Sequence, residues 1–294
     1  MALYVQTNVQ SMNTMRTLNI KTKSLDSSNE KLASGLSINS AKDDPANLQI
    51  SNNFTSQIAS KDRANRNADE GVAVAQTIEG ALDETTTLLQ RIRTLALQSA
   101  NGTNSEADRN ALQQEVAQMS DEITKIACKT TFGGAQVLRG ADNGLIDANG
   151  FLTLQIGANG GDQIKIDLSN SYRMEDLHQK VGQGMQGGYD TKNNVFDVST
   201  QENADDVLAN IDAFIQTIDE ARGELGSSMN RLESTIRNQS SQVQNESDAR
   251  SRMRDTDFAK ETSAYASTQI AQQAASKILM QANATPNFVL SLLR

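Results

Sequence analysis

The chain has only two prolines, Pro45 and Pro286, so the 240 residues between them carry none of the strongest helix breaker. Along much of this stretch apolar residues recur at alternating spacings of three and four. That period is typical of a helix that packs lengthwise against another helix. The pattern predicts a mainly α-helical chain built from long, coiled-coil-like segments.

The apolar series occurs in both halves of the chain, and a helix can bury such a seam only against another helix. In the first half it comprises Met15, Leu18, Thr22, Leu25, Asn29, Leu32 and Leu36, then Val74, Ile78, Ala81, Thr85, Leu88, Ile92, Leu95 and Ser99, then Leu112, Val116, Met119, Ile123 and Ile126. In the second half it comprises Val207, Ile211, Phe214, Ile218, Ala221 and Leu225, then, after a one-residue stutter, Met229, Leu232, Ile236, Gln239 and Val243.

Local signals mark where these helices begin and turn. Asp44 before Pro45 supplies an N-cap acceptor ahead of a proline at the first helical position. Residues 105–108 and 199–202 match the capping-box pattern. Residues 101–104 (Asn-Gly-Thr-Asn) predict a short turn between antiparallel helices. A helix from 45 to 100 would be about 80 Å long, which is a rod and not a globule.

The centre of the chain has a different character. Twelve of the eighteen glycines lie between residues 133 and 188, and residues 141–206 hold 11 acidic against 4 basic side chains. Apolar and polar residues alternate over 152–156 and again over 164–168, with the glycine-rich segment 157–161 between them. This arrangement predicts one β-hairpin. Residues 170–198 show little periodicity and are expected to hold loops, with His178 solvated among them, and one more hairpin at most.

The two ends of the chain have a weak seam. Residues 1–40 and 255–294 keep a heptad-like spacing, but the seam positions are small or polar, as at Ala271, Ala274, Ala275 and Ala282. A helix of this kind gains little from burial within one chain, and we expect it to be disordered in the monomer. Packing against further copies would supply the missing burial.

Composition excludes several classes of function. The net charge is −9, which argues against a nucleic-acid or acidic-membrane binder. One His and one Cys exclude most His-based catalysis, the zinc sites that need several such ligands, and a disulfide framework. No apolar run reaches the length of a membrane-spanning helix, and we expect no signal peptide. We therefore expect no enzymatic activity, no cofactor, no metal and no membrane insertion.

Several separate motifs resemble those of the bacterial flagellin family. They are residues 32–44 (Leu-Ala-Ser-Gly-Leu-Ser-Ile-Asn-Ser-Ala-Lys-Asp-Asp), 66–71 (Arg-Asn-Ala-Asp-Glu-Gly), 77–82, 89–93 (Leu-Gln-Arg-Ile-Arg), 98–101, 131–134 (Thr-Phe-Gly-Gly), 249–255 and 290–294 (Leu-Ser-Leu-Leu-Arg). They occur in the family's order and together cover about residues 1–168 and 195–294. Each motif is short, and their number and order make the resemblance specific.

The resemblance implies a structural subunit of the flagellar filament, secreted through the flagellar export machinery and located outside the cell. It implies that residues 1–42 and 252–294 pair as the filament core, and that 43–251 form an outer helical rod domain with a β region at about 133–198. No large outer variable domain is expected. The implied partners are further copies of the chain, the export machinery, the filament cap, a flagellin export chaperone and the Toll-like receptor for flagellin.

Particular residues follow from the same resemblance. Candidate polymerisation-core residues are Leu3, Val5, Leu18, Leu25, Leu32, Ile278, Leu279, Val289, Leu290, Leu292, Leu293 and Arg294. Candidate receptor contacts are Gln90, Arg91, Leu95 and Glu115, which as ordinary helix residues would be solvated apart from a core Leu95. Leu154, Ile156, Ile164 and Ile166 would belong to a hairpin that acts as the family's switch element.

Two other readings stay open at this point. A hook–filament junction adaptor shares the plan of paired chain ends, although the motifs at 89–93 and 290–294 favour the filament subunit. An intracellular coiled-coil adaptor would need seams that are sufficient within one chain, and the terminal seams argue against it. Cys128 departs from the family pattern and is read as an incidental small residue or a labelling handle rather than a reactive thiol.

Overall fold

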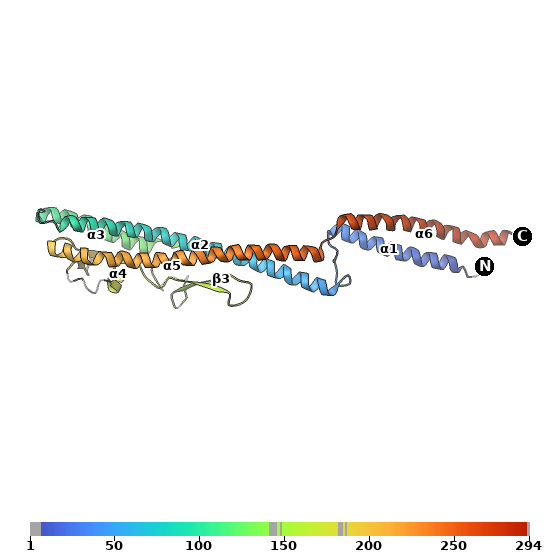
Figure 1. The fold of residues 1–294 in the computed structure, drawn as a ribbon, viewed down its shortest axis with the longest axis horizontal. Coiled ribbons are helices and arrows are strands. Elements are labelled where there is room, and N and C mark those ends of the chain that lie inside the picture. Colours follow the sequence, from blue (N-terminus) through green and yellow to red (C-terminus); the bar gives the residue numbers. More distant parts are fainter. Residues whose placement is uncertain (1–6, 141–145, 148, 182–184, 186, 293–294) are drawn as a thin grey trace. The chain divides into compact units, whose positions relative to one another are not determined.

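The computed structural model describes residues 7–140, 146–147, 149–181, 185 and 187–292, with backbone alone over 286–292. Within these residues the chain forms long helices and short antiparallel hairpins (Figure 1). The helices are α1 (Val9–Ser34), α2 (Pro45–Ser99), α3 (Glu106–Lys129), α4 (Met174–Val181), α5 (Gln201–Arg254) and α6 (Phe258–Leu292). The hairpins pair β1 (Thr131–Phe132) with β2 (Ala135–Gln136), β3 (Phe151–Gln155) with β4 (Gln163–Asp167), and β5 (Tyr189–Asp190) with β6 (Val195–Phe196). The predicted mainly α-helical class is confirmed.

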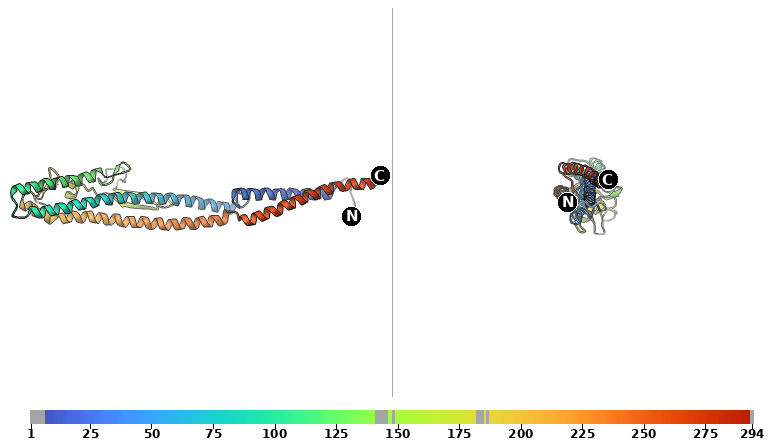
Figure 2. Two further views of the ribbon diagram at one scale, coloured as in Figure 1. Left: turned by 90° about the horizontal axis from the view of Figure 1, so that it is seen from above. Right: turned by 90° about the vertical axis from the view of Figure 1, so that its right-hand side faces the viewer.

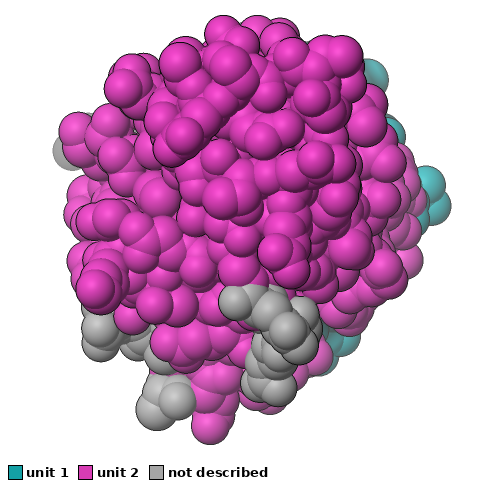
Figure 3. All heavy atoms as spheres, turned by 90° about the vertical axis from the view of Figure 1, so that its left-hand side faces the viewer, with its two compact units in different colours: residues 1–58, 244–294 teal, residues 59–243 magenta. Residues whose placement is uncertain are grey.

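The chain divides into two compact units, coloured separately in Figure 3. Unit 1 comprises residues 1–58 and 244–294, and unit 2 comprises residues 59–243. The sequence placed its boundaries at 42/43 and 251/252, close to where α1 and α5 end. The contacts place them inside the helices, later in the chain at 58/59 in α2 and earlier in the chain at 243/244 in α5.

Unit 2 contains most of the large buried side chains. In it α2 lies between α3 and α5, as the second view shows (Figure 2). Ion pairs link the three helices at their surface: Arg91 with Glu115 on α3 at 3.2 Å, and Arg93 with Asp212 on α5 at 3.0 Å. Predicted seam residues such as Ile78, Ile92 and Ile211 are fully buried.

A second buried stripe runs along α2 beside the predicted seam. It comprises Ala75, Leu82, Leu89 and Ala96, spaced seven residues apart, and none of these side chains is accessible to solvent. One seam suffices for a helix with one neighbour, whereas α2 is flanked by α3 and α5. The wider apolar face is the form expected for a helix covered on two sides.

The predicted starts of α2 and α3 are confirmed, whereas α5 begins one residue later than predicted, with Thr200 rather than Ser199 as its cap. α2 begins at Pro45, and Asp44 accepts a hydrogen bond from the Asn47 amide at 3.0 Å. At the start of α3, Ser105 Oγ accepts from the Asp108 amide at 3.3 Å, and Asp108 Oδ2 accepts from the Ser105 amide at 3.0 Å. These two reciprocal bonds make a capping box. At the start of α5, Thr200 Oγ1 accepts from the Asn203 amide at 3.2 Å.

Replacing Ser105 with alanine is expected to lower the free energy of unfolding by about 1 kcal/mol, because the first turn of α3 loses a cap. Hydrogen bonds from the Ser105 hydroxyl and amide also hold the pKa of Asp108 below its ordinary value of 3.8. A lowered folded-state pKa stabilises the fold above that value, and the contribution is lost as pH falls through the lowered pKa. Urea unfolding at neutral and acidic pH measures both effects, with Thr103→Ala in the preceding turn as control. Equal stability of the two variants would contradict the prediction.

The central hairpin forms as predicted. Leu152 pairs with Ile166 and Leu154 with Ile164 across β3 and β4. Side-chain amides fasten the hairpin to two helices: Asn67 Nδ2 on α2 donates to the Gln155 carbonyl at 2.9 Å, and Gln239 on α5 donates to the Ile156 carbonyl. Glycine at position 71 of α2 permits this approach, since a Cβ there would collide with Leu154.

The segment after this hairpin differs from the prediction. Residues 174–181 form α4, and His178 lies on that helix rather than in a loop. Its ring stacks on Tyr189 with centroids 3.8 Å apart, Tyr189 meets Phe196 edge to face, and Phe196 meets Phe214 in the same way. Burial lowers the pKa of His178. A helix of two turns is too short for periodicity to reveal, and the aromatic contacts that hold it come from distant parts of the chain.

Candidate functional site

The pair formed by α1 and α6 in unit 1 buries almost no large apolar side chain. The two helices lie side by side and run antiparallel (Figure 1). In α1 only Ser28 is buried, and in the described side chains of α6 the buried residues are Ala275 and Ala282. Two residues of the predicted α1 seam are not buried between the helices, since Asn29 is exposed and Met15 is 52 % exposed. The pair therefore has little hydrophobic stabilisation of its own.

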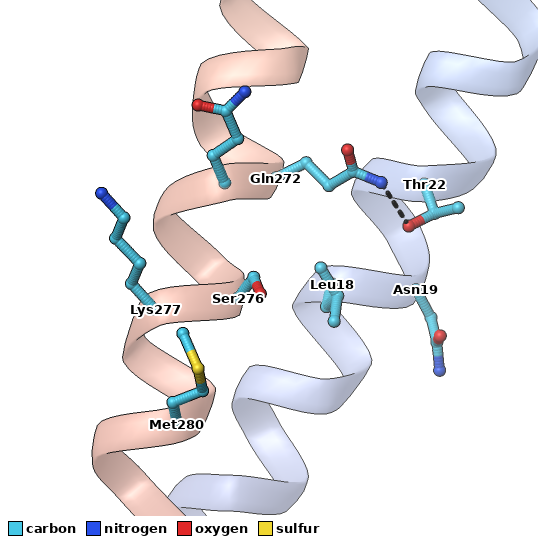
Figure 4. A pocket seen from close by; sticks show the side chains of 8 residues that line it. Leu18, Asn19, Thr22, Gln272, Ser276, Lys277 and Met280 are labelled. Atoms are coloured by element: carbon cyan, nitrogen blue, oxygen red, sulfur yellow. Dashed lines mark hydrogen bonds between the residues drawn. The ribbon is translucent and has the colours of Figure 1, made fainter.

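Polar contacts hold the two helices together. Asn8 Nδ2 donates to the Ala282 carbonyl at 2.7 Å, and Ser11 Oγ donates to Asn283 Oδ1 at 2.6 Å. Gln272 Nε2 reaches from α6 to Thr22 Oγ1 at 3.0 Å (Figure 4). Each such bond adds about 1 kcal/mol net at best, because water competes for both groups.

A groove of about 570 Å³ runs between the same helices (Figure 4). Most of the residues that line it are of polar type, and they comprise Leu18, Asn19, Thr22, Gln272, Gln273, Ser276, Lys277 and Met280. The groove is open to solvent, so the side chains that line it are only partly covered by the helix pair.

Apolar side chains instead face outward on both helices. Of the ten large apolar residues that are exposed in the described part of the chain, eight lie on α1 or α6. We call these eight the terminal-helix surface: Val9, Met12, Met15, Ile20, Phe258, Ile270, Ile278 and Met280. They are spread along both helices, and in the rest of the described chain the large exposed apolar side chains are limited to Ile50 and Leu97. A helix pair that exposes so many apolar groups is a candidate contact surface for another molecule.

The chain segments next to this pair are well ordered by hydrogen bonds. α1 ends at Gly35, whose positive φ of 72° suits a glycine C-cap. The Thr256 amide donates to the Gly35 carbonyl at 2.9 Å, and the Ser37 amide donates to the Arg254 carbonyl at 2.6 Å. In the following loop, bonds from the Ser40 and Asn39 amides lower the pKa of Asp43. These contacts join the segment that follows α1 to the segment that precedes α6, at the end of the helix pair where both segments meet.

The structure places the predicted polymerisation residues in three groups. Leu18, Leu25, Leu32 and Leu279 are half-buried, and Ile278 is half exposed. Val289, Leu290 and Leu292 lie on α6 where backbone alone is described. Leu3, Val5, Leu293 and Arg294 lie outside the described residues.

Most of the terminal-helix surface was not predicted from the sequence. Val9, Met12, Ile20, Ile270 and Met280 fall off the heptad seam, and Met15 was assigned to the seam itself. The sequence signal that could have revealed this surface is the presence of large apolar residues at helix positions outside the seam, which a single helix pair leaves exposed to solvent.

The four candidate receptor residues do not share one environment. Arg91 and Glu115 form an ion pair at 3.2 Å on the surface of unit 2, and Gln90 is exposed beside them. Leu95 is only 3 % exposed and belongs to the core. An outside molecule could therefore reach three of the four in this fold.

The described part of the chain offers little support for a metal site or a membrane-spanning helix. Among those residues no three His, Cys, Asp or Glu side chains are grouped so as to hold a metal ion. No described helix is both long enough and apolar enough to cross a membrane. Cys128 is a half-buried free thiol near the end of α3. Long helices that leave large apolar side chains exposed towards the chain ends are typical of structural proteins that associate with other chains.

Comparison with known proteins identifies the family. A model described as the bacterial flagellin N-terminal helical region matches residues 5–143, and one described as the C-terminal helical region matches 208–293. Polar flagellin B/D of Vibrio parahaemolyticus is 37% identical and flagellin D of Vibrio anguillarum 36% identical, each over the full length of both chains. The chain belongs to the bacterial flagellin family. It is a structural subunit that polymerises into the filament of the flagellum, and membership in this structural family accords with the expectation that it is not an enzyme.

One solved structure shows the same fold at low sequence similarity. A protein described as a flagellar hook-associated protein of Vibrio parahaemolyticus is 15% identical, with a TM-score of 0.57, over 72% of this chain and 100% of that one. At that identity the likeness concerns the fold alone. Nothing in it favours the junction-adaptor alternative over the filament subunit.

Proposed function

We propose that residues 1–42 and 252–294 form the core of the filament and that the terminal-helix surface is the contact by which each subunit joins its neighbours. Residues 43–251 then form the outer part of the filament wall. The observation that carries this assignment is the contrast between the two units. Unit 2 buries most of its large apolar side chains, whereas α1 and the described side chains of α6 include no large apolar residue that is fully buried.

The same contrast supports a mechanism for growth. Each Leu, Ile or Met that moves from water into a packed interface contributes about 1.5–3 kcal/mol. The isolated α1–α6 pair lacks this term and is held mainly by polar bonds, so its helices fold fully only when a groove of existing subunits covers them. Growth is then confined to the filament end, where such a groove is vacant.

The finer partners follow from the family. We propose that the chain is exported through the flagellar export machinery, delivered to the growing end beneath the filament cap, and held beforehand by a flagellin export chaperone. The extracellular filament is its final location. Recognition by the Toll-like receptor for flagellin would rest on Gln90, Arg91 and Glu115, because Leu95 is buried.

We also propose that the β3–β4 hairpin is the element that changes when subunits switch packing. Its half-buried Leu154 and Ile156, and its buried Ile164 and Ile166, pack against the helical core of unit 2. The two amide bonds from Asn67 and Gln239 reach only its β3 side. A shift in the register of α2 against α5 would therefore pull on this hairpin directly.

A seeded assembly assay tests the core assignment. Heat-dissociated protein is cooled, mixed with short sheared filaments, and followed by sedimentation and negative-stain microscopy. We expect the full chain to extend the seeds and a variant lacking residues 280–294 to do so at least about a hundredfold more slowly, since the deletion removes several apolar contacts.

The control is Thr103→Ala, which changes a turn in unit 2 and is expected to extend seeds normally. Thermal unfolding of unit 2 should be the same in all three proteins. A truncated chain that still forms long filaments would overturn the core assignment. A full chain that stops after a short ring on the seed would favour the junction-adaptor alternative.

A further inference from the structure

The methionines differ in exposure between the two units, and the half-buried Met253 of unit 1 is intermediate. The chain has nine, of which Met1 lies outside the described residues. Met174 in unit 2 is fully buried, and Met119, Met185 and Met229 pack against the core there. The three exposed methionines all lie on α1 or α6: Met12 at 64 %, Met15 at 52 % and Met280 at 64 %.

These three thioethers lie within the terminal-helix surface itself. Met12 and Met15 are three residues apart on α1 and line one shallow hollow with Ile20. Met280 lies at the groove between α6 and α1 (Figure 4). Methionine is flexible and polarisable, which suits a surface that must adapt to a partner. Its sulfur is also the atom in such a surface that is most easily oxidised.

We propose that Met12, Met15 and Met280 are oxidation sites at which a peroxide-class oxidant blocks entry of the subunit into the filament. This inference rests on the proposed function of the terminal-helix surface. In the reaction the thioether sulfur attacks one peroxide oxygen, a sulfur–oxygen bond forms and the oxygen–oxygen bond breaks. Sulfur is oxidised by two electrons to the sulfoxide, the proton of the transferred oxygen passes to the second oxygen, and hydrogen peroxide is thereby reduced to water.

The sulfoxide changes the surface at the positions that assembly must cover. A flexible apolar side chain becomes a polar one with a strong hydrogen-bond acceptor. Covering that acceptor without a donor is unfavourable, so the oxidised subunit binds the filament end more weakly. A subunit already inside the filament has the same sulfurs covered, so oxidation acts on the free subunit and leaves the assembled filament intact.

The test uses the full chain in a Cys128→Ser background, so that the thiol takes no part. Free subunits and finished filaments are each treated with hydrogen peroxide, and peptide mass spectrometry locates the added oxygen. We expect oxidation at Met12, Met15 and Met280 well before Met174 in free subunits, and little at these sites in filaments. Seed extension by the treated subunits should fall at least about tenfold. Methionine sulfoxide reductases A and B together should restore it.

Two variants make the assignment specific. Met12→Leu/Met15→Leu/Met280→Leu keeps the apolar volume and is expected to extend seeds equally well before and after peroxide treatment. Met119→Leu/Met229→Leu in unit 2 is the matched control and should remain sensitive. Extension that is unchanged by confirmed oxidation of the three sites overturns this inference alone, as does equal sensitivity of the triple variant.

The remaining outcomes are also decisive. If the triple variant fails to extend seeds even before treatment, the reductase experiment on the Cys128→Ser protein decides, and failure to restore extension overturns the inference. If the untreated chain does not extend seeds at all, the proposed function fails and this inference fails with it.

Discussion

Replacing Leu89 with alanine is expected to lower the free energy of unfolding of unit 2 by about 2–5 kcal/mol. Leu89 is fully buried in the second stripe of α2, the one that the heptad series did not include. The substitution removes apolar contact and leaves a cavity that the surrounding long helices cannot readily close. Urea unfolding followed by circular dichroism should show a lower midpoint with an unchanged slope.

Leu97→Ala provides a control with the same chemistry on the same helix. Leu97 is 65 % exposed, so its truncation should change stability by no more than about 0.5 kcal/mol. If both variants unfolded at the same urea concentration, the second stripe would not be part of the core. If only Leu97→Ala were destabilised, the face that α2 presents to its neighbours would be assigned wrongly.

The largest effect on assembly is expected from Ala275→Glu on α6. Ala275 is 6 % exposed and is one of the few buried residues of that helix. Glutamate needs far more room than a methyl group there, and an unpaired carboxylate buried between helices is strongly unfavourable. We expect seed extension to be abolished, while thermal unfolding of unit 2 is unchanged because α6 belongs to unit 1.

Ala107→Glu controls for the added charge. Ala107 is exposed in the first turn of α3, where a carboxylate is favourable next to the helix N-terminus. This variant should extend seeds at the normal rate in the same sedimentation assay. Normal extension by Ala275→Glu would show that the α1–α6 pairing seen in the isolated chain is not retained in the filament.

The starts of the long helices α2 and α3 could be predicted closely from the sequence because their signals are local. Asp44 with Pro45, and Ser105 with Asp108, cap helices through bonds within three or four residues. The β3–β4 hairpin was equally predictable, since strict alternation of apolar residues around a glycine-rich turn has few other solutions. Leu154 and Ile164 lie opposite each other in the observed register.

Other features depend on contacts between distant residues. α4 is short, and its His178 is held by Tyr189 from the next hairpin, which in turn meets Phe196. The second stripe along α2 is buried only because α3 and α5 both lie against that helix. Neither feature has a local pattern strong enough to distinguish it from a loop or an ordinary surface position.

The terminal helices show most clearly what each source of information decided. The sequence by itself indicated a helical period with a weak seam at both chain ends, because spacing and residue size are local properties, and from the weak seam we expected disorder in the monomer. Only the tertiary structure decided that Ser28 is buried, that Ala275 and Ala282 are buried while the seam residue Ala274 is exposed, and that Met12, Ile20 and Ile270 face solvent. The physical reason is that side chains at adjoining helical positions have nearly equal access to a partner, and the face that is buried depends on where the second helix lies.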